Sequence, residues 1–102
     1  MTLLGFQRHY LKALAHDLHP LVQTGKDGLS PALMAQVEAA LLVHELIKVR
    51  LTRPDDKKSL AQELAAKSTA TLVDLIGHTA ILYRPHPTAP RIHLPQRETE
   101  PT

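Results

Sequence analysis

Gly25-Lys26-Asp27-Gly28-Leu29-Ser30-Pro31 is the stretch that decides how this chain folds. A Gly-x-x-Gly loop turns the chain sharply, because glycine tolerates positive φ and lets another backbone come close. Ser30 can cap a helix, and Pro31 fits the first helical position, where no N–H is needed. The loop and the helix start both offer free backbone N–H groups, and Lys26 adds a full charge, so the stretch suits a phosphate. Taken alone, the motif is more often a plain turn between a strand and a helix.

Hydrophobic periodicity on both sides of this stretch predicts three helices. The first covers residues 3–17, with one apolar stripe and a basic solvent face; the second runs from Ser30 to about His44. The third runs from about Lys57 to Ser68, after a Pro54-Asp55-Asp56 turn that places an acid at its start. The expected apolar positions are Leu3, Phe6, Tyr10, Ala13 and Leu14 in the first helix, Leu33, Met34, Val37, Ala40, Leu41 and Leu42 in the second, and Leu60, Ala61, Leu64 and Ala65 in the third.

Four strands are expected, over residues 21–24, 45–52, 70–76 and 79–84. In the second, Ile47, Val49 and Leu51 alternate with Lys48 and Arg50, which indicates one buried and one basic face. Gly77-His78 suits a type II′ hairpin between the last two strands, with Ile81 and Tyr83 on one face and Leu82 and Arg84 on the other. Two strand–helix–strand crossovers require parallel neighbours. The pattern therefore predicts an α/β fold with a mixed four-stranded sheet and three helices that cover mainly one face.

The chain of 102 residues is long enough for one domain. Five of its eight prolines fall between Pro85 and Pro101. We therefore expect a folded domain over residues 1–85 and a Pro-rich tail over residues 86–102 that is extended or disordered. Within that tail, Arg91 to Leu94 is a candidate for a short edge strand.

Composition excludes several classes of protein. Twelve Lys and Arg against ten Asp and Glu give a formal charge of +2, with seven histidines besides, which leans the surface toward anions. The chain has no cysteine, so disulfides, thiolate nucleophiles and Cys-based zinc sites are excluded. Residues 1–11 contain neither an uninterrupted apolar signal region nor a membrane span. We expect a soluble, cytoplasmic protein.

Metal and catalytic motifs are weak. His16-x-x-His19 could chelate a metal only if a helix continued through Pro20, and His44-Glu45 has Lys48 where a zincin motif needs its second histidine. The serines have plainer uses as helix caps, turn residues or helix ends, and the glycines match neither a P-loop nor a dinucleotide fingerprint. The sequence predicts no enzyme, no metal and no cofactor. The serines in question are Ser30, Ser59 and Ser68.

For nucleic acid, the residues favour recognition of the backbone over recognition of bases. A sheet that stacks bases needs exposed aromatic residues, and this chain has only Phe6, Tyr10 and Tyr83. Its basic residues suit structured RNA held by shape and phosphates, and RNA-binding KH domains use a Gly-x-x-Gly loop in the same way. The candidate contacts besides the loop are Arg8 and Lys12 on the first helix, Lys48 and Arg50 on a strand, and His78 and Arg84 at the hairpin.

Several stretches together resemble the CRM domain, the RNA-binding module of chloroplast splicing factors and of small bacterial YhbY proteins. They cover nearly all of the chain up to Pro85: Leu14 to His16, Pro20 to Val22, Gly25 to Ser30, His44 to Arg50, and Ile76 to Pro85. The resemblance implies a fold similar to the C-terminal domain of translation initiation factor three. It also implies RNA binding through Gly25, Lys26, Asp27 and Gly28, and association with precursors of the large ribosomal subunit.

The chain departs from the family pattern at three positions. His19 and His78 stand where the family commonly has Lys or Arg, and Ala80 is smaller than usual. Because histidine gains its charge over the range from about pH 8 to pH 6, RNA affinity is expected to rise as pH falls through that range. Asp27 beside a phosphate would repel it, so its side chain is expected to turn away or to cap the helix at Ser30.

These patterns lead to one expected function and one rival. The expected function is that of a monomer that binds ribosomal RNA during assembly of the large subunit, without membrane contact. Each flanking basic residue should then contribute up to about one unit of salt dependence. The rival is an adapter that docks on a protein of the ribosomal particle and touches RNA incidentally. Its apolar interface would tolerate salt that strips a phosphate-bound protein.

Overall fold

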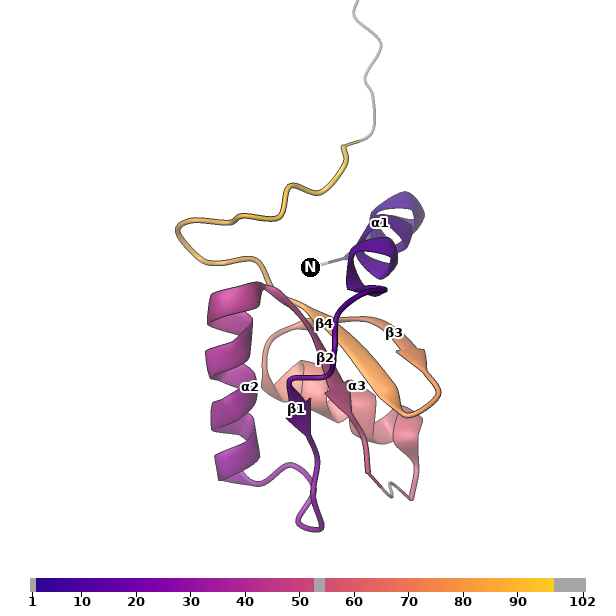
Figure 1. The fold of residues 1–102 in the computed structure, drawn as a ribbon, viewed down its shortest axis with the longest axis vertical. Helices are drawn as coiled ribbons and strands as arrows, with labels where there is room; N and C mark the ends of the chain where they lie inside the picture. Colours follow the sequence, from indigo (N-terminus) through magenta and orange to yellow (C-terminus); the bar gives the residue numbers. More distant parts are fainter. Residues whose placement is uncertain (1, 53–54, 97–102) are drawn as a thin grey trace, which may run out of the picture.

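A computed structural model describes residues 2–52 and 55–96. Figure 1 shows three helices around one sheet, so the predicted order of elements and the α/β class are confirmed. None of the helices in these two ranges is long and apolar enough to cross a membrane. The elements are α1 (Gly5–Ala15), β1 (Val22–Gln23), α2 (Pro31–His44), β2 (Leu46–Arg50), α3 (Lys57–Lys67), β3 (Thr71–Ile76) and β4 (Thr79–Tyr83).

The sheet is mixed, with the strand order β1-β2-β4-β3. β1 is parallel to β2, and β4 is antiparallel to both β2 and β3. The β1–α2–β2 crossover joins neighbours as predicted, but the β2–α3–β3 crossover does not, because β4 lies between those strands. The Gly77-His78 turn keeps β4 beside β3, and residues 80–83 are all buried, so β4 is a central strand and occupies the place next to β2. Gly77 has φ +59, as the first residue of a type II′ turn requires.

The helices lie on both faces of the sheet. α2 and α3 cover one face, with a core that includes Val37, Leu41, Val49, Leu64 and Leu82. The predicted alternation of β2 is confirmed, because Ile47, Val49 and Leu51 belong to this core while Lys48 and Arg50 point to the other face. The expectation that the helices cover mainly one face holds for α2 and α3, whereas α1 packs on the opposite face.

α1 buries a different side from the one predicted. Gln7, Leu11 and Ala15 are its buried residues, while Phe6 and Tyr10 are 39% and 37% exposed. The predicted stripe was wrong because polar anchors fix the rotation of the helix. Gln7 accepts a hydrogen bond from the Leu4 N–H (3.0 Å) and donates one to the Pro95 carbonyl (3.1 Å). Leu14 is also exposed, as is Leu42 on α2, which the sequence placed in the core.

The helix starts follow the capping residues in the sequence. Ser30 Oγ accepts the Leu33 N–H of α2 at 3.2 Å. Asp56 Oδ1 accepts the N–H groups of Lys58 and Ser59, each at 3.1 Å, and so caps α3. Pro54 lies outside the described residues. Both caps satisfy N–H groups that have no partner within their own helix.

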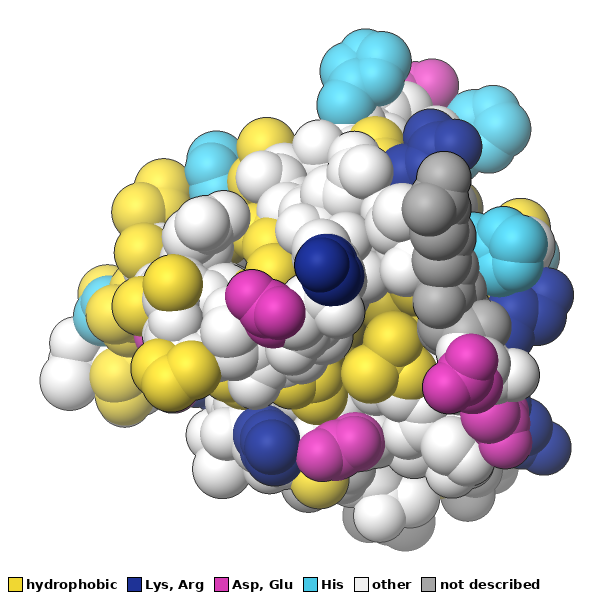
Figure 2. Space-filling model, turned by 90° about the horizontal axis from the view of Figure 1, so that it is seen from below, with side chains coloured by type: hydrophobic (Ala, Val, Ile, Leu, Met, Phe, Trp, Pro, Cys, Tyr) yellow, Lys and Arg dark blue, Asp and Glu magenta, His cyan; other side chains and the backbone are white. Residues whose placement is uncertain are grey.

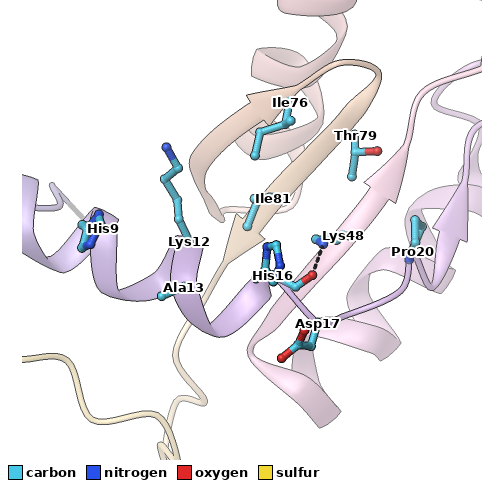
Figure 3. Close-up of a pocket in the computed structure, with 10 residues that line it drawn as sticks. All are labelled: His9, Lys12, Ala13, His16, Asp17, Pro20, Lys48, Ile76, Thr79 and Ile81. Carbon is cyan, nitrogen blue, oxygen red and sulfur yellow. Dashed lines mark hydrogen bonds between the residues drawn. The ribbon is translucent and has the colours of Figure 1, made fainter.

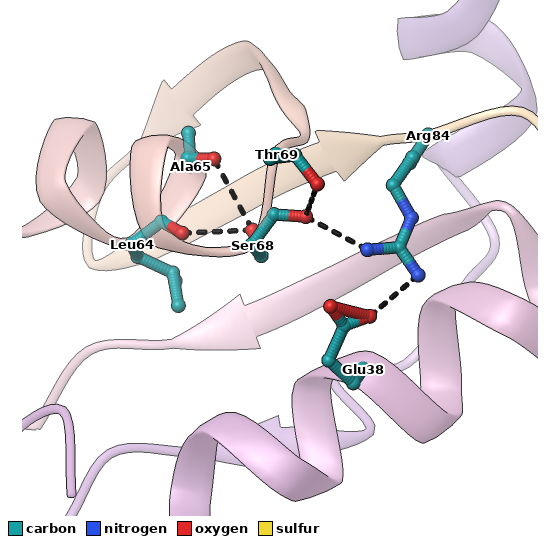
Figure 4. A network of polar contacts seen from close by, with 6 residues as sticks. All are labelled: Glu38, Leu64, Ala65, Ser68, Thr69 and Arg84. Atoms are coloured by element: carbon teal, nitrogen blue, oxygen red, sulfur yellow. Dashed lines mark hydrogen bonds and ion pairs between the residues drawn. The ribbon is translucent and has the colours of Figure 1, made fainter. Parts of the chain in front are cut away.

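Arg84 ties the two helices of this face together (Figure 4). Its guanidinium lies 2.6 Å from Glu38 Oε2 on α2 and donates to the Ser68 carbonyl at the end of α3, at 2.8 Å. The hydrogen bond from Arg84 lowers the pKa of Glu38 below its ordinary value. Arg84, which directly follows β4, therefore links the middle of α2 to the end of α3.

Glu45, between α2 and β2, fastens the segment that follows β4. Its buried carboxylate accepts the N–H groups of His86 (2.7 Å), Arg91 (2.7 Å) and Ile92 (3.0 Å). Ile92 and Leu94 pack against the core beneath α1. Residues 85–96 form neither helix nor strand, so the prediction of an edge strand at Arg91 to Leu94 is wrong. The N–H groups of residues 91 and 92 donate to the Glu45 side chain and not to a neighbouring strand. The domain boundary at Pro85 stays a prediction.

Glu45→Gln should lower the free energy of unfolding at pH 7 by about 1–3 kcal/mol, because the amide nitrogen would face backbone N–H donors. Burial raises the pKa of Glu45, but the three N–H donors and the charge of Arg91 outweigh it and leave the pKa below 4.5. A lowered pKa stabilises the fold above the unfolded value, and this contribution is lost as pH falls through the folded value. The difference between variant and parent should therefore shrink below about pH 4. Urea unfolding followed by circular dichroism measures it.

Glu63→Gln is the control, because Glu63 is half-exposed and, in the part of the chain that the structure describes, its one ion pair is with Lys67 on the surface of α3. That variant should unfold like the parent. A Glu45→Gln variant as stable as the parent at pH 7 would contradict a structural role for this carboxylate.

Candidate nucleic-acid interface

The loop from Gly25 to Gly28 stands clear of the rest of the fold, between β1 and α2 (Figure 1). The Gly28 N–H donates to the Gly25 carbonyl at 3.1 Å, and Gly28 has φ +61, a conformation that favours glycine. A Cβ added at Gly25 or at Gly28 would meet no protein atom within 4 Å. Open space therefore surrounds both glycines, and another backbone can approach them.

The donors of this region come from the loop more than from the helix. Pro31 has no N–H, and Ser30 takes the N–H groups of both Leu33 and Met34. Within the described residues, the N–H groups of Lys26 and Asp27 have no acceptor. Asp27 does not cap α2, because Ser30 does, so the capping alternative is wrong, and the alternative that its side chain turns away from a phosphate stays a prediction. A hollow of about 200 Å³ lies between the loop and the first turns of α2.

Beside the loop, one row of side chains crosses the sheet. Backbone pairing aligns Gln23 with Arg50, Arg50 with Thr79, and Thr79 with Ile76. Directly paired residues project from the same face of a sheet. This face is the one on which α1 packs, but α1 lies over the other end of the strands, near Leu46 and Tyr83. We call these four residues the open row, since three of them are exposed and Thr79 is partly so.

The predicted basic contacts divide into two groups. Four of them hold the fold, each through named partners: Arg8 Nη1 to the carbonyls of Leu72 (2.9 Å) and Val73, Lys12 to Asp74 (3.0 Å), Lys48 to the carbonyls of His16 (3.3 Å) and Leu18 (3.0 Å), and Arg84 as described above. Across residues 2–52 and 55–96, the side chains of Lys26, Arg50 and His78 have no hydrogen-bond or ion-pair partner, and all three are exposed. The first group already contacts other protein atoms, whereas the second has no such contact among the described residues; all seven stay predicted RNA contacts.

The pairs within the first group are charged at neutral pH. Burial raises the pKa of Asp74, but the hydrogen bond from Lys12 and the Leu75 N–H outweigh it, so the pKa lies below the ordinary 3.8. Arg8 adds to this effect. Lys12 therefore meets a carboxylate, and much of its charge is compensated before any ligand arrives.

The charge on the loop side of the molecule is mixed. Figure 2, seen from that side, shows Lys and Arg side chains next to Asp and Glu, and hydrophobic side chains gathered where α2 lies. A ligand bound here meets single cations at defined places, not a continuous basic patch. Among the described residues, no three His, Asp or Glu side chains group together as metal ligands.

Sequence reasoning missed the polar neighbours of the predicted cations. Gln23 and Thr79 flank Arg50 in the open row, and Gln36 lines the hollow beside the loop. No local pattern marks these residues. The register of β1 and β4 against β2 would have identified the first two, but it depends on contacts between segments far apart in the chain.

Comparison with known proteins places the chain in a family. The CRS1/YhbY (CRM) domain matches residues 3–84. The chain is 40% identical over 98 residues to a protein of Haemophilus influenzae named "RNA-binding protein", with 94% of this chain and 98% of that protein covered. It is 37% identical over 95 residues to "Probable RNA-binding protein YqeI" of Bacillus subtilis, with 91% and 99% covered.

A solved structure agrees with these sequence matches. The solution structure of the hypothetical protein SAV1595 from Staphylococcus aureus superposes with a TM-score of 0.78 at 38% identity, over 92% of this chain and 100% of that one. The family match covers the three helices and all four strands described above. This chain belongs to the CRS1/YhbY (CRM) domain family.

Proposed function

We propose that this protein binds structured ribosomal RNA through the Gly25–Gly28 loop and the open row, and acts in assembly of the large ribosomal subunit. The observation that carries the proposal is the exposed loop, whose N–H groups and neighbouring cations have no partner among the described residues. The names of the relatives from Haemophilus influenzae and Bacillus subtilis support an RNA ligand.

The chemistry of the loop fits a phosphate. The N–H groups of Lys26 and Asp27 can donate to phosphate oxygens, and the Lys26 ammonium supplies charge. Arg50 extends this contact onto the sheet, because Gln23 next to it is the last residue of β1 before the loop. The contact reads the RNA backbone and its shape, with little recognition of bases.

Gly25→Ala separates a clamp from a plain turn. Its φ lies outside the left-handed region and its Cβ would meet nothing, so the variant should fold with unchanged stability. The added methyl would occupy the space into which an RNA backbone must come. We expect RNA affinity to fall by about tenfold, measured by fluorescence anisotropy with a structured ribosomal RNA fragment.

The matched control is Gly5→Ala at the start of α1, where a Cβ also meets nothing within 4 Å. It should leave both stability and RNA affinity unchanged. If Gly25→Ala binds RNA like the parent, the loop is a structural turn.

Arg50→Gln should reduce the slope of log affinity against log salt by up to about one unit, because one phosphate contact is lost. Lys57→Gln, which removes an exposed charge from α3 on the opposite face, should leave the slope unchanged. Affinity measured at four or more salt concentrations gives the slope. Equal slopes for the two variants would remove Arg50 from the interface.

The assembly role is tested by sedimentation of tagged protein from cell lysate in gradients of varied salt. The protein should migrate with precursors of the large subunit at low salt, and both added salt and Lys26→Asp should release it. A second candidate, the adapter, is favoured by the exposed apolar flank of α1 at Phe6, Tyr10 and Leu14. If both the parent and the variant stay with the particles at high salt, the adapter is correct.

A further inference from the structure

A groove of about 760 Å³ runs between α1 and the sheet, apart from the Gly25–Gly28 loop. Figure 3 shows His9, Lys12 and Ala13 of α1, with His16 just after it, on one side and Ile76, Thr79 and Ile81 of the hairpin on the other. The groove exists because α1 covers only part of its face of the sheet. It begins at Ile76 and Thr79, the end of the open row.

The floor of the groove is apolar. Ile81 and Ala13 line it, and Ile76 is 56% exposed on the edge strand β3. Ile76 is the apolar member of the open row, whose other three residues are polar. The floor is therefore suited to contact a flat, apolar group of a ligand.

The rim of the groove is basic. The imidazoles of His9 and His16 are exposed there, and Lys48 lies between α1 and the sheet. Two N–H groups of Lys48 donate to the carbonyls of His16 and Leu18, which leaves one of three for a ligand. Asp17 is the acidic member of the lining. Lys12, which also lines the groove, is already paired with Asp74.

We propose that this groove takes one unpaired nucleotide of the bound RNA. This inference rests on the proposed function. The base would lie on the exposed side chain of Ile76 with an imidazole against its face, and its phosphate would meet Lys48. Histidine rings stack on unpaired bases as larger aromatic rings do, so the groove supplies the stacking surface that the aromatic content of the sequence does not offer.

The position of the groove favours RNA over an acidic peptide. The open row runs from Gln23, next to the loop, to Ile76, across four strands that are about 4.8 Å apart. Gln23 and Ile76 are therefore about 14 Å apart along a row that carries Arg50, so one RNA can reach both the loop beside Gln23 and the groove beside Ile76. The loop and Arg50 are suited to the phosphates of an RNA backbone, and the groove at the end of the row is suited to a base.

The test uses the full chain and two RNA hairpins that are identical except for one bulged nucleotide. The bulged RNA should bind at least fivefold more tightly, since stacking of one base is worth roughly that factor or more. Ile76→Ser should abolish this preference, so that its affinities for the bulged and the paired hairpin become equal. Val43→Ser is the matched control, because Val43 is equally exposed, at 56%, on α2. It should keep the preference.

A second measurement does not depend on variants. With 5-iodouridine at the bulge, photocrosslinking followed by mass spectrometry should map the nucleotide to the segment around His9 and His16. Equal affinity for both hairpins, or a crosslink elsewhere, would overturn the groove while RNA binding itself stands. Failure to bind either hairpin would overturn the proposed function as well. If Ile76→Ser keeps both RNA affinities but no longer sediments with ribosomal particles, the groove docks a protein and the proposal is wrong.

Discussion

Three parts of this fold depend on the hydrogen bonds of Glu45. The backbone N–H of Glu45 donates to the Leu41 carbonyl at the end of α2, and the backbone carbonyl of Glu45 accepts the Arg84 N–H after β4. Its side chain holds residues 86–92. A non-glycine residue at φ 63 is strained, and a buried carboxylate is costly unless it is hydrogen-bonded. Three backbone N–H donors offset the cost of burying the carboxylate. Residue 45 can therefore turn the chain from helix to strand and also anchor residues 86–92.

The pairing of charged groups within the fold also explains why the basic residues differ in role. Arg8, Lys12, Lys48 and Arg84 each pair with carbonyls or carboxylates of the protein. The contacts of Arg8 and Lys12 join α1 to β3, beside the apolar packing of Leu11 and Ala15. Lys26 and Arg50 lie on a turn and an open strand face, where the backbone is already satisfied or solvated. A small net charge can therefore still present cations to a ligand, provided that the right ones are left free.

Local patterns in the sequence were sufficient for most of the fold. The caps at Ser30 and Asp56, the alternation around Ile47 and the glycine at the hairpin are each short-range signals, and each appears as expected. Two features depend on distant partners and were missed. α1 is rotated because Gln7 bonds residue 95, and β4 lies between β2 and β3 because both of its edges are paired. The groove depends on both the rotation of α1 and the place of β4 in the sheet. Local sequence patterns therefore could not have placed His9 opposite Ile76.

The central position of β4 has a consequence for synthesis of the protein. β4 is the last strand to leave the ribosome, yet it pairs with β2, whose residues come some thirty positions earlier. Until residues 79–83 emerge, β2 has only the two-residue β1 to pair with, and α2 and α3 have no complete sheet to pack on. Contacts this distant in sequence also close slowly. The nascent chain should therefore gain little stable structure during translation and fold in one late step, after the hairpin of β3 and β4 has formed.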